Sequence, residues 1–290
     1  NPYYSKKIKQ FNISSFIKHK DFIFYELDIN KKNKLETVFK SSKIKAIVHL
    51  AASAGVTPSV ENPDVYVQNN ITATQNLSDL CIKYKVTNFI FASTSSVYGN
   101  NKTPFIETMH TSFSNAPYPA TKKASEVLLW TYSLNNNINT TIFRFFNPLG
   151  KKIRPDLALT KLIRSALYKT EFPVFQDLKS CARDYTALCD MLEVIYTVIK
   201  KPFKYEIFNL GNGKPENLDT LIKVVEKVTG KKVNLQIKDR RKGEMQITYA
   251  DITKAKKLLK YNPSSSLQRI VKDYYEWFIK QPDWYKRGDY

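Results

Sequence analysis

The sequence predicts a doubly wound α/β fold, in which helices cover both faces of a parallel β-sheet. Short apolar segments alternate along the chain with longer polar segments that carry apolar residues at helical spacing. The short segments are apolar almost throughout, which is typical of strands buried on both faces. With 290 residues, 42% of them hydrophobic, the chain can bury a sizeable core.

The first half of the chain supplies the main sheet and its helices. Strands are expected at residues 22–27, 46–52, 89–94 and 140–146, with the sequences FIFYEL, AIVHLAA, FIFAST and TTIFRFF. Helices are expected at residues 31–42, from Pro63 to about residue 84, and from about Tyr118 to Leu134. Residues 1–147 are therefore expected to form the dinucleotide-binding type of domain, with the sheet at its centre.

The pattern changes after Asn147, and residues 148–290 are expected to form a smaller α/β cap. Helices are predicted at about residues 157–168 and 188–200, and strands at 172–175 and 205–211. No linker or low-complexity tract divides the two parts, so the cap is expected to pack on the first domain. The segment around residues 182–210 is expected to return to the main sheet.

Two later helices carry capping signals. Asn217 can cap a helix that ends at Gly230. Ser265 and Gln268 form a capping box before the last helix, LQRIVKDYYEWF.

The composition argues against a metal site. There are three cysteines (Cys81, Cys181 and Cys189) and no CxxC pair, which argues against a disulfide framework or a thiolate metal site. Three scattered histidines argue against a His-based metal cage. His49 lies inside the apolar run IVHLAA and is expected to pack in a strand.

The formal net charge is +20, but the lysines are spread along the whole chain and no aromatic-interleaved basic block stands out. A Lys-rich composition is the favoured explanation, and a nucleic-acid partner is kept only as a minority alternative. The positive field would help to gather an anionic small substrate. No apolar run approaches the ~20 residues that span a membrane, so no membrane partner and a cytoplasmic location are expected.

One part of a dinucleotide-binding sheet is missing from the sequence. Such a sheet opens with a strand and a Gly-rich turn at a helix N-terminus, where backbone N–H groups bind the pyrophosphate. The chain has eight glycines, the first is Gly55, and neither GxGxxG nor GxxGxxG occurs. Either the chain binds no dinucleotide, or its first β-α-β unit lies before Asn1.

Tyr118 and Lys122, in the segment NAPYPATKKA, are four residues apart at a predicted helix start. Side chains at this spacing share one face of a helix and can meet. A cation beside a tyrosine favours the phenolate, which would make the tyrosine a usable base near neutral pH. The spacing alone fits an exposed Tyr and a solvated Lys equally well, so both interpretations remain open at this point.

Eight segments, taken in order, resemble the extended short-chain dehydrogenase/reductase family of nucleotide-sugar epimerases and dehydratases. They are DIN at 28–30, HLAASAGV at 49–56, YVQNN at 66–70, FASTSSVYG at 91–99, YPATK at 118–122, RFFNPLG at 144–150, ARDYT at 182–186 and RRKGE at 240–244. AASAGV followed by PSVENP, and RPDLAL at 154–159, look most like the UDP-glucuronate 4-epimerase branch. The opening NPYY resembles the segment just after the second strand of those enzymes, which implies a Rossmann-like domain whose first β-α-β unit precedes Asn1.

The resemblance implies an NAD-dependent 4-epimerisation of a UDP-sugar through a transient 4-keto intermediate. Tyr118 would be the catalytic base and acid, Lys122 its electrostatic partner and a ligand of the nicotinamide ribose, and Thr94 the proton relay. The other implied cofactor contacts are Asp28, Ile29, Leu50, Ala51, Ala52 and Asn69. The implied substrate contacts are Ser95, Ser96, Asn147, Lys161, Arg183, Arg241 and Glu244.

The favoured substrate is UDP-glucuronate, converted to UDP-galacturonate, but two residues depart from that branch. Lys161 stands where the UDP-glucuronate branch carries an Arg that meets the sugar carboxylate. A lysine ammonium, which is a point charge, therefore replaces a planar guanidinium with two parallel donors. Asn147 stands where Thr is usual, and RFFNP looks more like UDP-glucose 4-epimerases. A UDP-glucose or UDP-N-acetylhexosamine 4-epimerase is therefore the alternative. Among other reactions of the family, decarboxylation of the sugar is harder to exclude than 4,6-dehydration.

An alternative from another class is a catalytically inactive fragment or binding protein, because the pyrophosphate-binding turn is missing from this sequence. A homodimer is the expected assembly. Members of the family often pair through the two helices that here contain residues 63–84 and 118–134.

Overall fold

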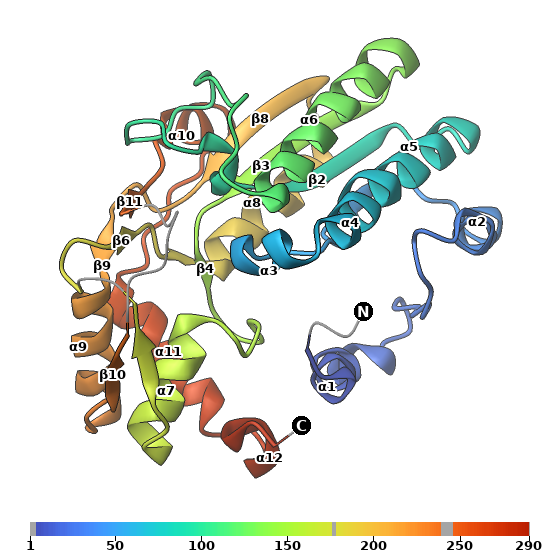
Figure 1. Ribbon diagram of the computed structural model, residues 1–290. Helices are drawn as coiled ribbons and strands as arrows, with labels where there is room; N and C mark the ends of the chain where they lie inside the picture. Colours follow the sequence, from blue (N-terminus) through green and yellow to red (C-terminus); the bar gives the residue numbers. More distant parts are fainter. Residues whose placement is uncertain (1–3, 176–177, 239–245, 290) are drawn as a thin grey trace.

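The computed structural model describes residues 4–175, 178–238 and 246–289. At its centre is a parallel sheet with the strand order β1-β2-β3-β8 (Figure 1). The strands are β1 (Ile47–His49), β2 (Asn88–Thr94), β3 (Asn139–Phe145) and β8 (Tyr205–Leu210). A parallel sheet whose strands are joined by helices confirms the predicted doubly wound α/β class.

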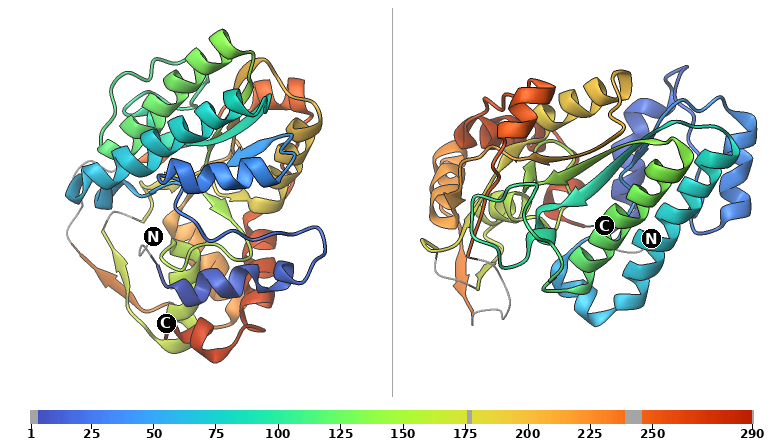
Figure 2. Two further views of the ribbon diagram at one scale, coloured as in Figure 1. Left: turned by 90° about the vertical axis from the view of Figure 1, so that its right-hand side faces the viewer. Right: turned by 90° about the horizontal axis from the view of Figure 1, so that it is seen from above.

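Helices cover both faces of this sheet (Figure 2). Along β2, Phe89 and Phe91 join the core on one face, whereas Ile90 joins the core on the other. This alternation explains why the strands are apolar almost throughout. The first face is covered by α2 (Lys32–Ser41), α5 (Ala73–Lys83) and α6 (Pro117–Asn136), and the second by α8 (Leu188–Lys200) and α10 (Thr253–Leu259).

The helix predicted from Pro63 to about residue 84 is present, with an irregular middle. It runs as α4 (Pro63–Tyr66), the π-helical η1 (Val67–Thr72) and then α5. A short helix, α3 (Val56–Glu61), precedes it. Single π-helical turns are rare and frequently lie at functional sites, and this one carries Asn69 and Asn70.

The second part of the chain packs around a core of its own. Its helices are α7 (Ala158–Tyr168), α9 (Leu218–Thr229), α11 (Leu267–Phe278) and α12 (Asp283–Arg287). Short strand pairs accompany them: β5 (Phe172–Val174) with β10 (Leu235–Ile237), β4 (Pro148–Leu149) with β7 (Thr186–Ala187), and β6 (Ala182–Arg183) between β11 (Ile247–Thr248) and β9 (Glu216–Asn217). Because β8 lies in the main sheet, we propose a cap of residues 148–290 from which the segment around 182–210 returns.

The predicted strand at residues 22–27 is wrong. These residues have no regular secondary structure, and they pair with no strand in the described parts of the chain. Ile23, Phe24 and Tyr25 remain 69%, 50% and 44% exposed. An apolar β-prone sequence supplies the propensity for a strand, but the strand forms only when a neighbour accepts its backbone hydrogen bonds.

Two ends of helices test the capping predictions. The Asn217 side chain accepts a hydrogen bond from the Thr220 N–H at 2.8 Å, and α9 ends at Gly230 with φ of 68°, as predicted. The capping box at Ser265 is wrong by one residue. Ser266 caps α11 instead, because its Oγ accepts from the Arg269 N–H at 3.2 Å.

The helix α1 (Lys6–Ile17) was not predicted. It buries Ile8 in the core of the second part and packs Phe11 against Trp284 and Tyr285, at ring-centroid distances of 5.5 Å each. The amino-terminal helix therefore lies beside the carboxyl-terminal α12 (Figure 1).

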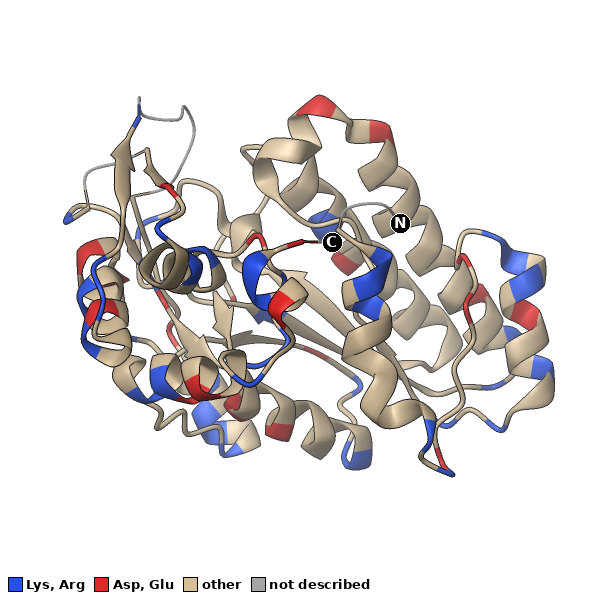
Figure 3. Cartoon of the chain, turned by 90° about the horizontal axis from the view of Figure 1, so that it is seen from below, with Lys and Arg blue, Asp and Glu red and all other residues tan. Residues whose placement is uncertain are grey.

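The charged residues form no single block in the view of Figure 3, where Lys and Arg positions are scattered over most elements and acidic positions lie among them. None of the helices in the described residues is both long enough and apolar enough to cross a membrane.

Candidate active site

Several predicted site residues lie where the parallel strands end. Leu50 directly follows β1, Thr94 is the last residue of β2, and Asn147 lies two residues after the end of β3. The carboxyl ends of parallel strands meet at one edge of a sheet, which is where ligands bind in such folds.

Lys122 is buried against β2. Its side chain lies on α6 and is 3% exposed, and its Nζ donates a 2.7 Å hydrogen bond to the carbonyl oxygen of Ala92. The same Nζ lies 4.5 Å from the centre of the Phe91 ring. A solvated Lys122, the alternative left open by the spacing, is therefore excluded.

Tyr118 precedes Lys122 by one helical turn, at the start of α6. Its ring meets the Tyr66 ring edge to face at a centroid distance of 6.0 Å, and the Tyr66 hydroxyl donates to the Ala54 carbonyl at 3.0 Å. These contacts hold the helix start against the loop that follows β1.

Thr94 is 8% exposed and ends β2. Its hydroxyl accepts a hydrogen bond from the Ser96 N–H and donates one to Ser96 Oγ, each at 3.2 Å. Ser95 and Ser96, both half-buried, open the 3₁₀ turn η2 (Ser95–Tyr98). The three predicted hydroxyl residues therefore lie together at the end of β2 and in the turn that follows it.

Burial dominates the electrostatics beside Lys122. It lowers the pKa of Lys122 to about 7, and the Glu126 carboxylate opposes that shift. Burial also lowers the pKa of His49 to about 3, with a smaller contribution from the Lys122 charge, so His49 is neutral. The His49 Nε2 contacts Thr74 Oγ1 at 3.0 Å, and the ring is 3% exposed in β1, as predicted for a packed strand residue.

Two of the residues predicted to hold the cofactor, Asp28 and Asn69, are joined through Asn30 in one hydrogen-bonded cluster. The Asn30 amide donates to Asn69 Oδ1 at 2.8 Å, and the Asn69 amide donates to Ser53 Oγ at 2.9 Å. Asp28 Oδ1 accepts from the Asn30 N–H at 2.9 Å, which fixes the turn after Ile29. Segments that are distant in the sequence, 28–30, 53 and 69, are thus brought together.

Several observations in this cluster fit a bound dinucleotide. Asn30 Oδ1 is buried and has no hydrogen-bond partner in the described parts of the chain, which leaves an acceptor for a ligand donor. Leu50 is 56% exposed directly after the buried His49, and Ala51 is exposed beside it. The small Ala51 and Ala52 side chains leave the backbone at this strand end open to close approach.

Asn70 is a buried residue that the sequence analysis missed. It is 0% exposed, its Oδ1 accepts from the Ser53 N–H at 2.8 Å, and its amide donates to Thr121 Oγ1 at 2.9 Å. It therefore links the loop after β1 to α6, next to Lys122. The available signal was its place in YVQNN, directly after the predicted Asn69.

The predicted substrate residues are less closely connected. Asn147 is exposed, and its carbonyl accepts from the Thr186 N–H at 3.2 Å, within the pair of β4 and β7. Arg183 Nη1 donates to the carbonyls of Ala182 and Gln246 at 3.0 and 2.9 Å. Lys161 lies exposed on α7. The predicted Arg241 and Glu244 lie outside the described residues.

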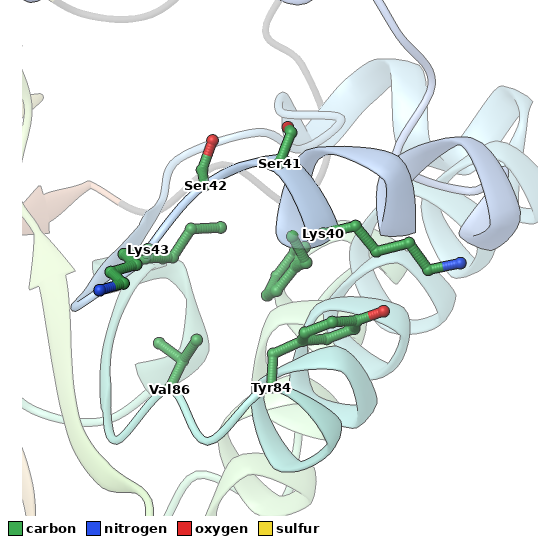
Figure 4. A pocket seen from close by; sticks show the side chains of 8 residues that line it. Lys40, Ser41, Ser42, Lys43, Tyr84 and Val86 are labelled. Carbon is green, nitrogen blue, oxygen red and sulfur yellow. The ribbon is translucent and has the colours of Figure 1, made fainter.

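A cavity of about 630 Å³ lies beside Arg183. Gln246, whose carbonyl accepts from Arg183, lines it together with Val174, Phe175 and Leu235. Its walls come from β5 and β10 and from the start of α9, and they are mixed apolar and polar. A second cavity, of about 390 Å³, lies between Phe39 and Tyr84 near the amino ends of β1 and β2, away from the strand ends that carry the site residues (Figure 4).

The family model described as the NAD dependent epimerase/dehydratase family matches residues 5–211 of the chain. The chain belongs to this family. The family predicted from the sequence is thus confirmed, and with it the enzyme class. A UDP-glucuronate 4-epimerase of Thermodesulfobacterium geofontis is 36% identical over 278 residues, which cover 96% of this chain and 85% of that protein.

Solved structures of the family are similar over nearly the whole chain. The UDP-glucuronic acid 4-epimerase from Bacillus cereus, in complex with UDP-glucuronic acid and NAD, gives a TM-score of 0.87 at 30% identity, covering 98% of this chain and 87% of that chain. The UDP-glucose 4-epimerase of Thermotoga maritima, solved with UDP-glucose, gives a TM-score of 0.85 at 29% identity. The match covers 90% of this chain and 85% of that chain.

Proposed function

We propose that the protein is an NAD-dependent UDP-sugar 4-epimerase that interconverts UDP-glucuronate and UDP-galacturonate. The observation that carries the proposal is the seating of α6 on the end of β2, which buries Lys122 one turn from Tyr118 and beside the strand that ends in Thr94. Nucleotide-sugar epimerases of the same family are similar over almost the whole chain.

In this proposal Tyr118 takes the proton from the 4-hydroxyl of the sugar and later returns it. Free tyrosine has a pKa of about 10, so the reaction near neutral pH needs a neighbouring positive charge. Lys122 supplies that charge, and its bond to the Ala92 carbonyl fixes its position. Thr94, at the end of β2, passes the proton between the sugar and Tyr118.

NAD would accept and return the hydride at C4 of the sugar. We propose that Asp28, Ile29 and the unpaired Asn30 Oδ1 hold its adenine end, and that Leu50, Ala51, Ala52 and Asn69 line the rest of its path. Support comes from the connected polar cluster and from the open strand end described above.

The cavity beside Arg183 is our proposed site for the uridine part of the substrate. A guanidinium can bind a diphosphate with two parallel hydrogen bonds, and Arg183 donates to the carbonyl of Gln246, which lines this cavity. Arg241 and Glu244, which lie outside the described residues, stay proposed substrate contacts on the sequence resemblance alone. Ser95, Ser96, Asn147 and Lys161 are proposed to contact the sugar.

We also propose a homodimer. Val127, Trp130 and Leu134 lie on one face of α6 and are 52%, 46% and 60% exposed, although large apolar side chains are usually covered. Val65, Val67 and Ile82 are exposed on the neighbouring α4, η1 and α5. Pairing of this face with its copy would cover both sets.

The proposal is tested with protein expressed from its complete reading frame and supplied with NAD. UDP-glucuronate, UDP-glucose and UDP-N-acetylglucosamine are incubated separately, and the 4-epimers are separated by chromatography. We expect the fastest turnover with UDP-glucuronate, and substrate deuterated at C4 should keep the label in the product because the hydride returns to the same carbon.

Each outcome decides between the alternatives. Turnover of UDP-glucose without UDP-glucuronate contradicts the substrate and favours the alternative suggested by Asn147. Binding of NAD without turnover of any sugar contradicts the epimerase. The absence of NAD binding in calorimetry favours a catalytically inactive binding protein.

A further inference from the structure

Glu126 lies one helical turn after Lys122 on α6 and has no part in the reaction proposed above. Its side chain is fully buried, with 0% of the residue exposed. A buried carboxylate is costly unless donors and cations compensate it. Its contacts therefore indicate what it does at this place.

Arg144 and Ser93 donate the three shortest hydrogen bonds to the carboxylate, and Lys123 Nζ lies 3.5 Å from its Oε2. Arg144 on β3, which is 1% exposed, donates from Nε to Oε1 at 3.0 Å and from Nη2 to Oε2 at 2.7 Å. Ser93 Oγ donates to Oε1 at 2.6 Å. Arg144 is itself fixed, since its guanidinium lies 4.8 Å from the centre of the Tyr98 ring and its Nη1 donates to the Glu107 carbonyl at 3.3 Å. A bidentate pair of this kind holds one geometry.

These contacts fix the same helix at the same part of β2 as Lys122 does. Ala92 accepts the Lys122 hydrogen bond, Ser93 bonds Glu126, and the next residue is Thr94. Glu126 therefore fixes how α6 lies along β2 at the end of the strand that carries the proposed proton relay.

The charges around Lys122 give Glu126 a second effect. From β1, His49 faces Lys122 and is neutral; from β2, the Ala92 carbonyl and the Phe91 ring meet it; on α6, Tyr118 and Glu126 lie one turn before and after it. Among these groups only Glu126 is an anion, and it acts against the cost of burying the Lys122 charge.

We propose that Glu126 is a positioning residue for the epimerase reaction: its carboxylate, held by Ser93 and Arg144, fixes α6 on β2 and keeps the Lys122 ammonium charged beside Tyr118. The inference rests on the proposed function, because the charge on Lys122 affects turnover only if Tyr118 is the base. Its electrostatic part can nevertheless be measured without turnover.

Two variants separate charge from packing. Glu126→Gln keeps the size of the side chain and an acceptor for Ser93, but it leaves the Arg144 charge buried and unpaired, which destabilises the fold. The double variant Glu126→Gln/Arg144→Met removes both charges, so no unpaired charge stays buried and the protein is expected to remain folded for the measurement. The matched control is Glu226→Gln on α9, whose carboxylate pairs with Lys232 at 2.7 Å in the cap.

The first readout is the pKa of Lys122, followed by NMR titration of protein labelled with ¹³C-lysine and assigned with Lys122→Met. We expect this pKa to fall in Glu126→Gln, to fall by less in the double variant, which also removes the Arg144 cation, and to stay unchanged in Glu226→Gln. The second readout is the pH profile of kcat. Because the reaction needs the charged Lys122, the descending limb of this profile moves to lower pH, so that turnover at pH 7 falls about fivefold and recovers in more acidic buffer.

The outcomes for the two proposals are distinct. A folded double variant with the wild-type Lys122 pKa overturns the inference, because a Glu126 with a purely structural role would not change the pKa of Lys122. Failure of the wild-type protein to epimerise any UDP-sugar overturns the proposed function, while the Lys122 titration still decides whether Glu126 sets the charge.

Discussion

The Lys122 amino group and the Ala92 carbonyl oxygen are 2.7 Å apart, and this hydrogen bond joins α6 to the carboxyl end of β2. The carbonyl satisfies one of the three N–H donors of the ammonium, whose side chain is almost wholly removed from water. Burial of the Lys122 charge therefore costs folding free energy, but it places that charge close to Tyr118. Stability and the proposed chemistry are opposed at this residue.

The first prediction is that Lys122→Met stabilises the protein and abolishes turnover. Burial lowers the pKa of Lys122 to about 7, whereas the unfolded value is about 10.4, so the unfolded chain binds more protons between these values. The free energy of unfolding therefore falls as the pH drops from about 10.4 toward 7, because the buried Lys122 must then carry a charge. We expect the free energy of unfolding at pH 7 to rise by roughly 2–4 kcal/mol, and the gain to shrink by pH 10.

Urea unfolding at the two pH values measures the effect. The control is Lys123→Met, the adjacent residue, whose side chain is 29% exposed beside Glu126 and for which a small change is expected. A Lys122→Met protein that is no more stable than the wild type at pH 7 would contradict the burial cost.

The second prediction concerns acid stability and His49. Burial lowers its pKa to about 3, and the unfolded value is about 6.5, so below that value the unfolded chain takes up a proton that the folded protein refuses. Stability therefore falls as the pH drops from about 6.5 toward 3. His49→Gln keeps a polar partner for Thr74 and removes the imidazole that takes up this proton. Between pH 7 and 4.5 the free energy of unfolding of the variant should therefore fall by roughly 1–3 kcal/mol less than that of the wild type.

Urea unfolding across this pH range checks the prediction, with the exposed His110→Gln as control. Identical pH dependence in His49→Gln and the wild type would show that other groups cause the acid sensitivity.

The third prediction concerns the buried ion pair. Arg144→Met leaves the Glu126 carboxylate buried without its bidentate partner and should reduce the free energy of unfolding by roughly 3–5 kcal/mol. The double variant with Glu126→Gln should lose clearly less than the sum of the two single variants. A double-mutant cycle from urea unfolding measures the coupling, and strict additivity would mean that the pair contributes nothing specific.

Much of the fold could be predicted because it depends on local patterns. β2 and α6 are long, strongly patterned segments, and both lie within a few residues of their predicted bounds. Residues 22–27 failed for the opposite reason, since a strand needs a partner that the local sequence does not specify. The helix α1 was missed because its sequence is largely polar and buries fully only Ile8.

The site divides in the same way. The sequence shows that Tyr118 and Lys122 share a helix face, because four residues make about one turn. It does not show that Asn70 bonds Thr121 or that Glu126 meets Arg144, since these contacts join different elements. Burial also could not be predicted from spacing, and burial decides whether Lys122 is solvated or perturbed.

The fourth prediction concerns the proposed acid and base. Tyr118→Phe removes the phenol but keeps the ring that packs on Tyr66, so kcat should fall at least about 10³-fold while UDP binding in calorimetry stays within about twofold. Thr94→Ser, which keeps the hydroxyl, should retain most of the activity, and Thr94→Ala should lose about 10–100-fold. Substantial turnover by Tyr118→Phe would remove Tyr118 from the mechanism.

The last prediction concerns the proposed homodimer. Val127→Glu/Leu134→Glu places two carboxylates on the exposed apolar face of α6, and like charges then face one another across a pairing of two copies. We expect a homodimer of the wild-type protein in light scattering and a dissociation constant at least about 100-fold weaker in the variant. The matched control is Leu192→Glu on α8, a leucine that is 51% exposed on the opposite face of the sheet. Because both changes replace exposed apolar residues by glutamate, a shift to monomer in the α6 variant alone assigns the interface to α6. A monomeric wild-type protein, or equal dissociation in the α8 control, contradicts it.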